Sequence, residues 1–337
     1  MATPEKKRYL QIHEGHCSWL VPEERRFIKP EAIETFILAG EPDRWRNTPD
    51  RPLRHFNGLD HYFDVEDLDT YGLSATNLSH FRFEFTAQLA MVRAKHPEKF
   101  PVDEKDLDRT KHMPGFLPWA IMENYAKLKS GFSYLKVYEE MGTPEEVAQA
   151  RQNILYVMGV MGHYVGDCTQ PLHTTKHFNG WVGENPKNFA TNKTFHSWID
   201  GGYLRKAGGL KDAELRAKLR PANVLTNDGA AVRDAEEVFR LVMRFIGEQH
   251  KLVEPLYEMN KDGRLSGNGD RGMEAFPLLS NQIQLAAQLL GDLWFTAYQS
   301  APVDNFLKNQ LATRKLQAEA KDGKTEAKPK TKKKTAK

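Results

Sequence analysis

Apolar residues recur at helical spacing over most of this chain of 337 residues. A long amphipathic helix is predicted from Asp234 to about Met259, because its apolar residues share one face: Val238, Phe239, Leu241, Val242, Phe245 and Ile246. The same spacing predicts helices over about 76–95, from Trp119 to Leu135 and from Phe276 to Gln299. Strand-like alternation is scarce, and no repeat of fixed period is visible. We therefore expect an all-α fold of several helices with long irregular loops.

The clearest start and stop signals bound one helix in the middle of the chain. Thr143-Pro-Glu-Glu146 supplies an N-cap Thr, Pro at the first helical position and Glu three residues after the cap. The helix should continue to about Gln170, because Pro171 would then end it. Its run from Ile154 to Met161 is apolar on nearly every face, which predicts that this part is buried.

Polar residues interrupt this apolar helix near its end. His163 and Asp167 are four residues apart, so they share one face, and His173 follows just beyond the predicted end. A buried charge that lacks a partner is too costly, so these side chains should pair with each other or hold a metal ion.

The remaining segments read mostly as connections. Residues 41–75 and 174–191 are rich in Gly, Asn, Asp or Pro and should be loops, the first with brief helical turns. Pro30 and Gly40 bracket a short predicted helix, and a further helix should carry Phe195 to Asp200. The chain thus divides into an unstructured lead over 1–10, one all-helical domain over 11–305 and a disordered Lys-rich tail over 306–337.

Charge is concentrated in that tail. Residues 312–337 hold ten Lys or Arg against three Asp or Glu, which leaves a mildly acidic body although the whole chain is +3. We expect a solvated tail that binds anions only weakly. No membrane span and no secretory signal are visible, so the chain as written is expected in the cytoplasm. Two cysteines are too few for a disulfide framework.

A second His-x-x-x-Asp pair, His196 and Asp200, repeats the spacing of His163 and Asp167. One such pair is more often a hydrogen-bonded feature of a helix than a set of ligands. Two pairs together with His173 favour a metal site, although spacing alone does not decide between these interpretations. Imidazole and carboxylate ligands suit zinc, and neighbouring ions favour the hydrolysis of phosphoesters.

The segment from His163 to His173, His-Tyr-Val-Gly-Asp-Cys-Thr-Gln-Pro-Leu-His, resembles the signature of a family of zinc phosphodiesterases. This family contains bacterial zinc-dependent phospholipase C and the single-strand-specific nucleases of fungi and plants. The resemblance covers about residues 11–300 and implies an all-helical fold with three zinc ions. The Asp at position 200 and the separation of His173 from His196 resemble the nucleases more than the phospholipases.

The same resemblance extends to segments upstream. The run Asp60-His61-Tyr62-Phe63-Asp64 is similar to the His-aromatic-x-Asp segment of the family, and Asp43-Arg-Trp-Arg46 is similar to its Asp-x-x-Arg. The resemblance implies Asp43 and Arg46 as catalytic residues, with Arg46 near the phosphate. Asp50, in the same loop, competes for the ligand role of Asp43. Tyr62 and Asp64 resemble the aromatic and acidic residues that bind a base in the nucleases, while a plain core aromatic is an equal alternative for Tyr62.

The resemblance also implies a distribution of ligands over three zinc ions. One ion is expected on Asp43, His61, His163 and Asp167. A second is expected on His173, His196 and Asp200. A third would be shared by His16 and Asp167, which acts as a bridge.

The third site is where the chain departs from the family. Family members are usually exported, and their mature N-terminal residue binds this ion, but no such terminus is visible here. Three explanations are open: His13 replaces the missing ligand, the site is weak or empty and two ions remain, or the true N-terminus differs. Cys17 and Cys168 follow proposed ligands of this site, so they could form a disulfide in an exported protein or stay reduced in the cytoplasm.

We expect a zinc-dependent phosphodiester hydrolase that uses metal-activated water, with a lean to a single-strand nuclease or 3′-nucleotidase. The expected partner is then single-stranded nucleic acid or a nucleotide, and no stable protein partner is predicted. The first alternative is a zinc-dependent phospholipase C, which would bind a phospholipid headgroup. The second is a non-catalytic helical protein that binds metal without turnover.

Overall fold

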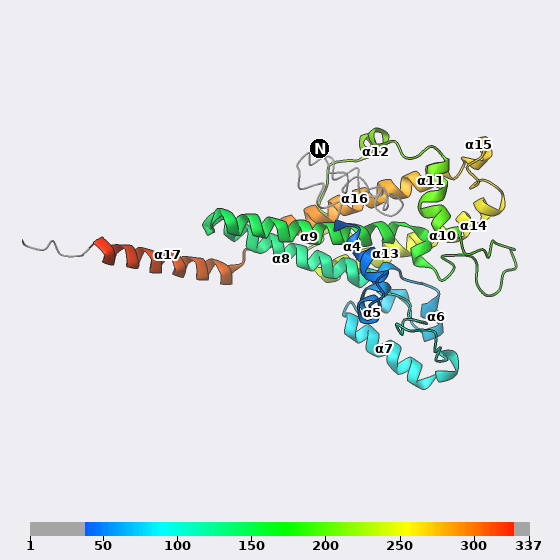
Figure 1. Ribbon diagram of the computed structural model, residues 1–337, viewed down its shortest axis with the longest axis horizontal. Coiled ribbons are helices and arrows are strands. Elements are labelled where there is room, and N and C mark those ends of the chain that lie inside the picture. The colour runs from blue at the N-terminus through cyan, green and yellow to red at the C-terminus, as the bar shows by residue number, and fades with distance from the viewer. Residues whose placement is uncertain (1–37, 327–337) are drawn as a thin grey trace, which may run out of the picture.

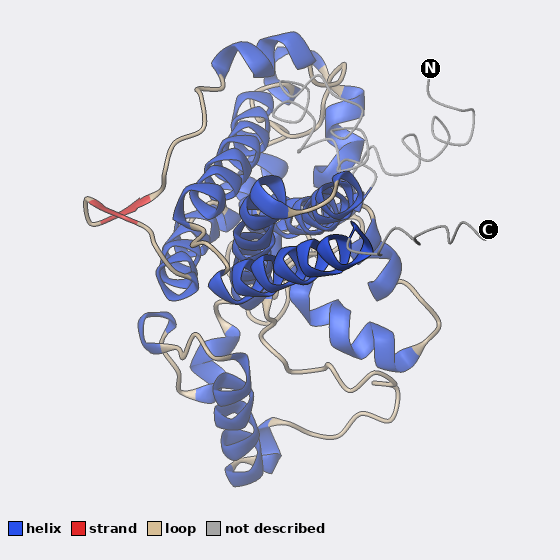
Figure 2. Cartoon of the chain, turned by 90° about the vertical axis from the view of Figure 1, so that its left-hand side faces the viewer, coloured by secondary structure: helices blue, strands red, loops and turns tan. Residues whose placement is uncertain are grey.

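The computed structural model describes residues 38–326, and the chain over this range is mainly helical (Figure 1). The α-helices are α4 (Glu41–Arg46), α5 (Arg51–Gly58), α6 (Asp67–Tyr71), α7 (Arg82–Lys95), α8 (Leu117–Met141), α9 (Pro144–Thr169), α10 (Phe195–Ser197), α11 (Tyr203–Lys206), α12 (Asp212–Lys218), α13 (Ala235–His250), α14 (Val253–Lys261), α15 (Gly269–Gly272), α16 (Phe276–Ser300) and α17 (Asn305–Glu326). Short 3-10 turns are η1 (Leu59–His61), η2 (Ala75–Asn77), η3 (Pro97–Lys99) and η4 (Pro171–Thr174), and η5 (Trp198–Gly202) is a π-helix. In the described range, two short strands, β1 (Thr226–Asn227) and β2 (Ala230–Ala231), form a small hairpin that is visible in Figure 2. The all-α expectation is therefore confirmed.

Long helices form the centre of the molecule. α8 and α9 pack against each other along their lengths, and α13 and α16 both pack against this pair. In the view of Figure 1, α5, α6 and α7 lie below this group, α10, α11, α14 and α15 lie at its right-hand end, and α12 lies above α16. The short helix α4 contacts α9. None of the helices in the described part of the chain combines the length and hydropathy needed to cross a membrane.

Two clusters of buried apolar side chains share this framework. The first joins α7, α8, α9, α13 and the C-terminal half of α16. The second joins the segment from Leu172 to Leu204 with α14 and the N-terminal half of α16. The end of α9 lies between them, so side chains placed there can contact residues held by either cluster.

The predicted limits of α9 are correct. Thr143 accepts a hydrogen bond from the backbone of Glu146, whose side chain accepts one from the backbone of Thr143, which completes the capping box. The helix ends at Thr169 with Gln170 as its C-cap, before Pro171. The predicted burial was too extensive, however, because Tyr156 is 45% exposed and continuous burial begins only at Gly159. The first half of α9 buries one face against its neighbours, and only its second half is surrounded.

The helix predicted from Asp234 to about Met259 is two helices, α13 and α14. α13 begins as predicted, with the Asp234 side chain accepting a hydrogen bond from the backbone of Glu237, but it ends at His250. Pro255 explains the break, because a proline ring clashes with the carbonyl four residues earlier, here that of Lys251. A straight helix through that position would contain this clash and would lose one backbone hydrogen bond.

The prediction of a disordered tail over 306–337 was wrong for its first part, since α17 extends to Glu326. Ala, Leu, Lys and Gln dominate this segment and favour helix. Its Leu311 is buried, Lys308 pairs with Glu140 at 2.9 Å and Arg314 pairs with Glu146 at 2.7 Å, so the first half of the helix is held against the ends of α8 and α9. Residues 327–337 lie outside the described range, as do the predicted lead and nearly all of the helix expected between Pro30 and Gly40.

Candidate metal centre

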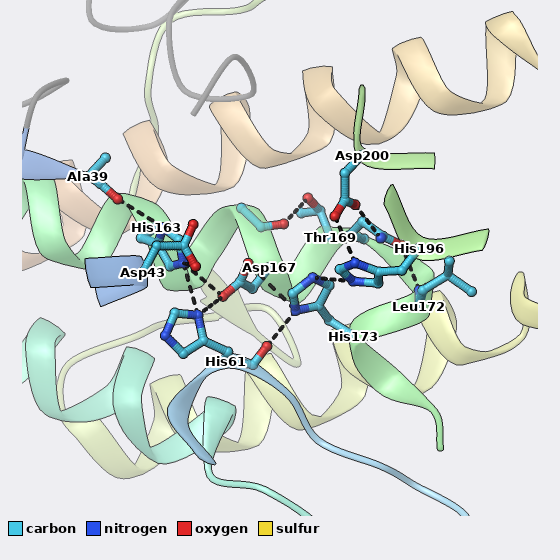
Figure 3. Close-up of polar contacts among 12 residues, drawn as sticks. Ala39, Asp43, His61, His163, Asp167, Thr169, Leu172, His173, His196 and Asp200 are labelled. Carbon is cyan, nitrogen blue, oxygen red and sulfur yellow. Dashed lines mark hydrogen bonds and ion pairs between the residues drawn. The ribbon is translucent and has the colours of Figure 1, made fainter. Parts of the chain in front are cut away.

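Three side chains from separate elements meet at the first of two ligand sets. Asp43 comes from α4, His61 from the turn η1 and His163 from α9, and all three are buried. The Nδ1 atom of His61 lies 2.9 Å from Nε2 of His163, which in turn lies 3.8 Å from Oδ1 of Asp43 (Figure 3). One ligand atom from each residue lies within 4.8 Å of the other two, so one ion could contact all three.

The second ligand set contains His173, His196 and Asp200. His173 belongs to η4, immediately after α9, whereas His196 and Asp200 belong to the helical segment formed by α10 and η5. The Nε2 atoms of the two histidines are 3.1 Å apart, and Nδ1 of His196 lies 2.9 Å from Oδ2 of Asp200. Asp200 lies in a π-helical turn, a distortion that is frequent at functional sites.

Asp167 stands between the two sets (Figure 3). Its Oδ2 atom is 3.0 Å from Nδ1 of His61 and 3.3 Å from Nε2 of His163. Its other carboxylate oxygen, Oδ1, is 3.6 Å from Nδ1 of His173. One buried carboxylate thus faces histidines of both sets. The bridge expected from the sequence was a different one, from the first ion to a third ion shared with His16, and it stays a prediction because His16 lies outside the described residues.

Backbone carbonyls fix the orientation of two imidazole rings. Nδ1 of His163 donates to the carbonyl of Ala39 at 2.8 Å, and Nδ1 of His173 donates to the carbonyl of His61 at 2.6 Å. A carbonyl can only accept, so these nitrogens carry the proton, and in the neutral ring Nε2 offers a lone pair. Both Nε2 atoms point into the ligand sets, as is usual for metal-binding histidines whose other nitrogen is held.

The electrostatics keep the ligands in the forms that bind cations. Burial lowers the pKa of His61 to about 3 and also lowers that of His173, so both rings are neutral near pH 7. Burial alone would raise the pKa of Asp167, but Coulombic attraction to His163 and His173 at the low pH where these rings are protonated, together with hydrogen bonds from His163 and His61, holds that pKa well below its ordinary value. Neutral imidazoles and an ionised carboxylate are the species that hold divalent ions.

A short extended segment positions His61. The backbone N–H groups of Phe63 and Val65 donate to the carbonyls of His173 and Thr174, at 2.9 and 3.1 Å. On its other side Phe63 forms a bridge with Gly115, whose φ of +97° and whose closeness to Tyr62 leave no space for a Cβ atom. The segment that follows His61 is therefore hydrogen-bonded to the backbone of His173, and the ring of His173 is hydrogen-bonded to the carbonyl of His61.

Other predicted residues lie outside the two ligand sets. Asp50, the competitor of Asp43, instead caps α5 by accepting a hydrogen bond from the backbone of Leu53 at 3.0 Å. Arg46 is half-buried, and its positive charge adds to the effect of burial in lowering the pKa of His61. The catalytic role of Arg46 stays a prediction.

The two predicted base-binding residues are close in sequence to His61 but differ in environment. Tyr62 is half-buried, and its hydroxyl lies 3.5 Å from the carbonyl of Met113. Asp64 is 9% exposed, and burial together with Asp67 and Glu66 raises its pKa well above the ordinary value. The proposed contact with a base is not tested by these positions.

The predictions for the third ion fall on residues outside the described range. These are His13 and His16, together with Cys17. Cys168 is a free thiol that is fully buried beside Asp167, and burial raises its pKa. The hypothesis that it pairs with Cys17 stays open.

Sequence reasoning missed the residues that support the ligands. The carbonyls of Ala39 and His61 leave no signal in a sequence, because every residue has a carbonyl. Gln170 did leave one: it stands between Asp167 and His173, is 3% exposed and donates to Oδ1 of Asp200 at 2.8 Å. A buried amide among proposed ligands could have been recognised as a candidate support.

Comparison of the chain with family models, with curated proteins and with solved structures gives no match. The site is therefore interpreted from its own chemistry. Each set supplies two imidazoles and a carboxylate, a donor set that fits zinc and related divalent ions. The two clusters could hold metal ions, and their geometry does not fix which metal.

Proposed function

We propose that the protein is a zinc-dependent phosphodiester hydrolase. The proposal rests chiefly on Asp167, one buried carboxylate that faces two sets of ligands. A structural His–Asp pair needs only one partner for each charge, whereas here further ligand-type side chains converge on the same carboxylate and its neighbours. Two ions in such an arrangement stabilise both the attacking and the leaving oxygen of a phosphoester, and they lower the pKa of bound water.

The residues of the chain have separate roles in this proposal. His61, His163 and Asp43 would hold one ion, and His173, His196 and Asp200 the other, with Asp167 facing both. Arg46, whose charge reaches His61, would neutralise charge that develops on the phosphate. Burial lowers the pKa of His61 and of His173, so these two rings need not lose a proton before they bind an ion near pH 7.

Within this class we favour a single-strand nuclease or 3′-nucleotidase. The support is the resemblance of Asp200, of the Asp43 to Arg46 segment and of Tyr62 with Asp64 to the nucleases. An aromatic that stacks on any base suits an enzyme that tolerates many sequences. A phospholipase C would use the same ions, so the choice between them depends on substrate.

The test is a pair of substrate assays on protein loaded with zinc. Single-stranded RNA and a 3′-nucleotide form one arm, and a phosphocholine ester forms the other. Hydrolysis of the nucleic acid substrates alone supports the nuclease, and hydrolysis of the ester alone supports the phospholipase. Protein that binds zinc but cleaves neither would support the non-catalytic alternative, and protein that binds no metal would refute the proposal.

A further inference from the structure

Gln170 connects the two parts of the chain that supply the second ligand set. Its Nε2 donates to Oδ1 of Asp200 at 2.8 Å, and its Oε1 accepts from the backbone N–H of Leu172 at 2.6 Å. The residue is 3% exposed and joins α9 to η4, the turn that carries His173. One side chain therefore contacts a ligand of this set and caps the turn that holds another.

The direction of this amide is fixed by its partners. The backbone N–H of Leu172 can only donate, so it must face the oxygen of the amide. The NH₂ group must then face Asp200, whose ionised carboxylate can only accept. A donor at Oδ1 fixes the carboxylate rotamer and leaves Oδ2, the oxygen nearest His196, directed at the ligand set.

Neighbouring amides provide a comparison. Gln282, on α16, donates to the carbonyl of Thr169 at 2.8 Å and is hydrogen-bonded to Gln249 on α13. Both side chains are buried, at 2% and 5% exposure, and these hydrogen bonds contact neither ligand set. Gln282 and Gln170 therefore both support the end of α9 through buried hydrogen bonds, but the bond from Gln170 goes to a ligand.

We propose that Gln170 is a positioning residue that holds Asp200 for the second ion, while the first ion does not depend on it. This inference rests on the proposed function in one respect, namely that the second ligand set binds a cation. Loss of a support of this kind costs about 10- to 100-fold in metal affinity. The loss should fall on one of two ions, whereas general damage to the fold would weaken both.

The experiment follows Co²⁺ binding to the metal-free full-length chain by visible absorption and calorimetry. The variants are Gln170→Met, which loses both bonds, and Gln170→Asn. An Asn side chain can accept from the backbone two residues on, so it keeps the cap on Leu172 but is too short to reach Asp200. The matched control is Gln282→Met. A further variant, His196→Asn, lacks one ligand of the second set, so the Co²⁺ binding event that it loses is assigned to that set.

Both Gln170 variants should lower the affinity of the Co²⁺ binding event assigned to the second set by about 10- to 100-fold. The affinity of the other binding event should not change. Gln282→Met should keep both events, whatever its effect on the thermal unfolding of the metal-free protein. Gln170→Asn with the affinity of the wild type, or an equal loss from both events, would overturn the proposal. Wild-type protein that binds no metal would instead refute the proposed function, so the two failures are distinguishable.

Discussion

Replacing Asp167 by Asn tests the centre most directly. The change keeps the shape of the side chain and removes its charge at the point where both ligand sets meet. A carboxylate and a divalent ion about 4 Å apart attract by roughly 8 kcal/mol at an effective dielectric of about 20. If desolvation offsets three quarters of this, about 2 kcal/mol remains, which corresponds to roughly a 30-fold loss of affinity.

The metal-free fold should respond much less to the same substitution. In the Asp167→Asn variant, the new amide NH₂ can donate to Nε2 of His163, which offers a lone pair because its Nδ1 donates to Ala39. The substitution also removes the cost of burying a charge. We therefore expect the free energy of unfolding of metal-free protein to change by about 1–2 kcal/mol at most.

The assay combines zinc calorimetry with urea unfolding of metal-free protein. Asp292→Asn is the control: this buried carboxylate on α16 accepts hydrogen bonds from Arg220 and from the backbone of Asn223. The control should lose about 1–3 kcal/mol of stability and bind zinc as the wild type does. Unchanged zinc affinity and stoichiometry in Asp167→Asn would refute the bridging role of this carboxylate.

Three further predictions concern single features of the fold. Gly115→Ala should cost about 2–4 kcal/mol in urea unfolding, because the added Cβ would lie 2.0 Å from the carbonyl oxygen of Tyr62, and wild-type stability would contradict this. Cys168, whose pKa burial raises, should resist thiol alkylation in native protein and react after denaturation; rapid native labelling, measured by mass spectrometry, would show that the end of α9 opens. The hydrogen bond from Arg314 lowers the pKa of Glu146 to about 2, so this carboxylate stabilises the fold above its ordinary pKa of 4.5 and loses that effect as pH falls towards 2. Urea unfolding at low salt should therefore show wild type and Glu146→Gln converging in stability over that interval, and a constant difference would argue against the pair.

Local signals in the sequence predict much of the helical framework. The capping box at Thr143 and the proline at 171 bound α9 correctly, because both act through neighbouring backbone groups. The break after His250 was missed although Pro255 marks it, since apolar spacing continues across the break. α17 was missed because its composition favours disorder and helix alike, and distant partners such as Glu146 decide between them.

The candidate site was predictable in its residue types and less so in its arrangement. Spacing along a helix places His163 with Asp167, and His196 with Asp200, but it does not bring the two pairs together. The second pair meets the end of α9 through His173 and Gln170, and His61 joins the first pair from more than 100 residues away in sequence. The extended segment after His61 and the carbonyl partners of the rings follow from the tertiary fold alone.

The double use of His61 has a consequence for biosynthesis. Its ring belongs to the first ligand set, and its backbone carbonyl accepts a hydrogen bond from His173 of the second set. One residue therefore serves both sets. While the ribosome is still making the chain, His61 emerges long before α9, and Asp200 emerges later still. The long helices α13 and α16, which pack against α9, emerge later again. Capture of ions is therefore expected of the finished chain, and a truncated or stalled product should leave the ribosome without them.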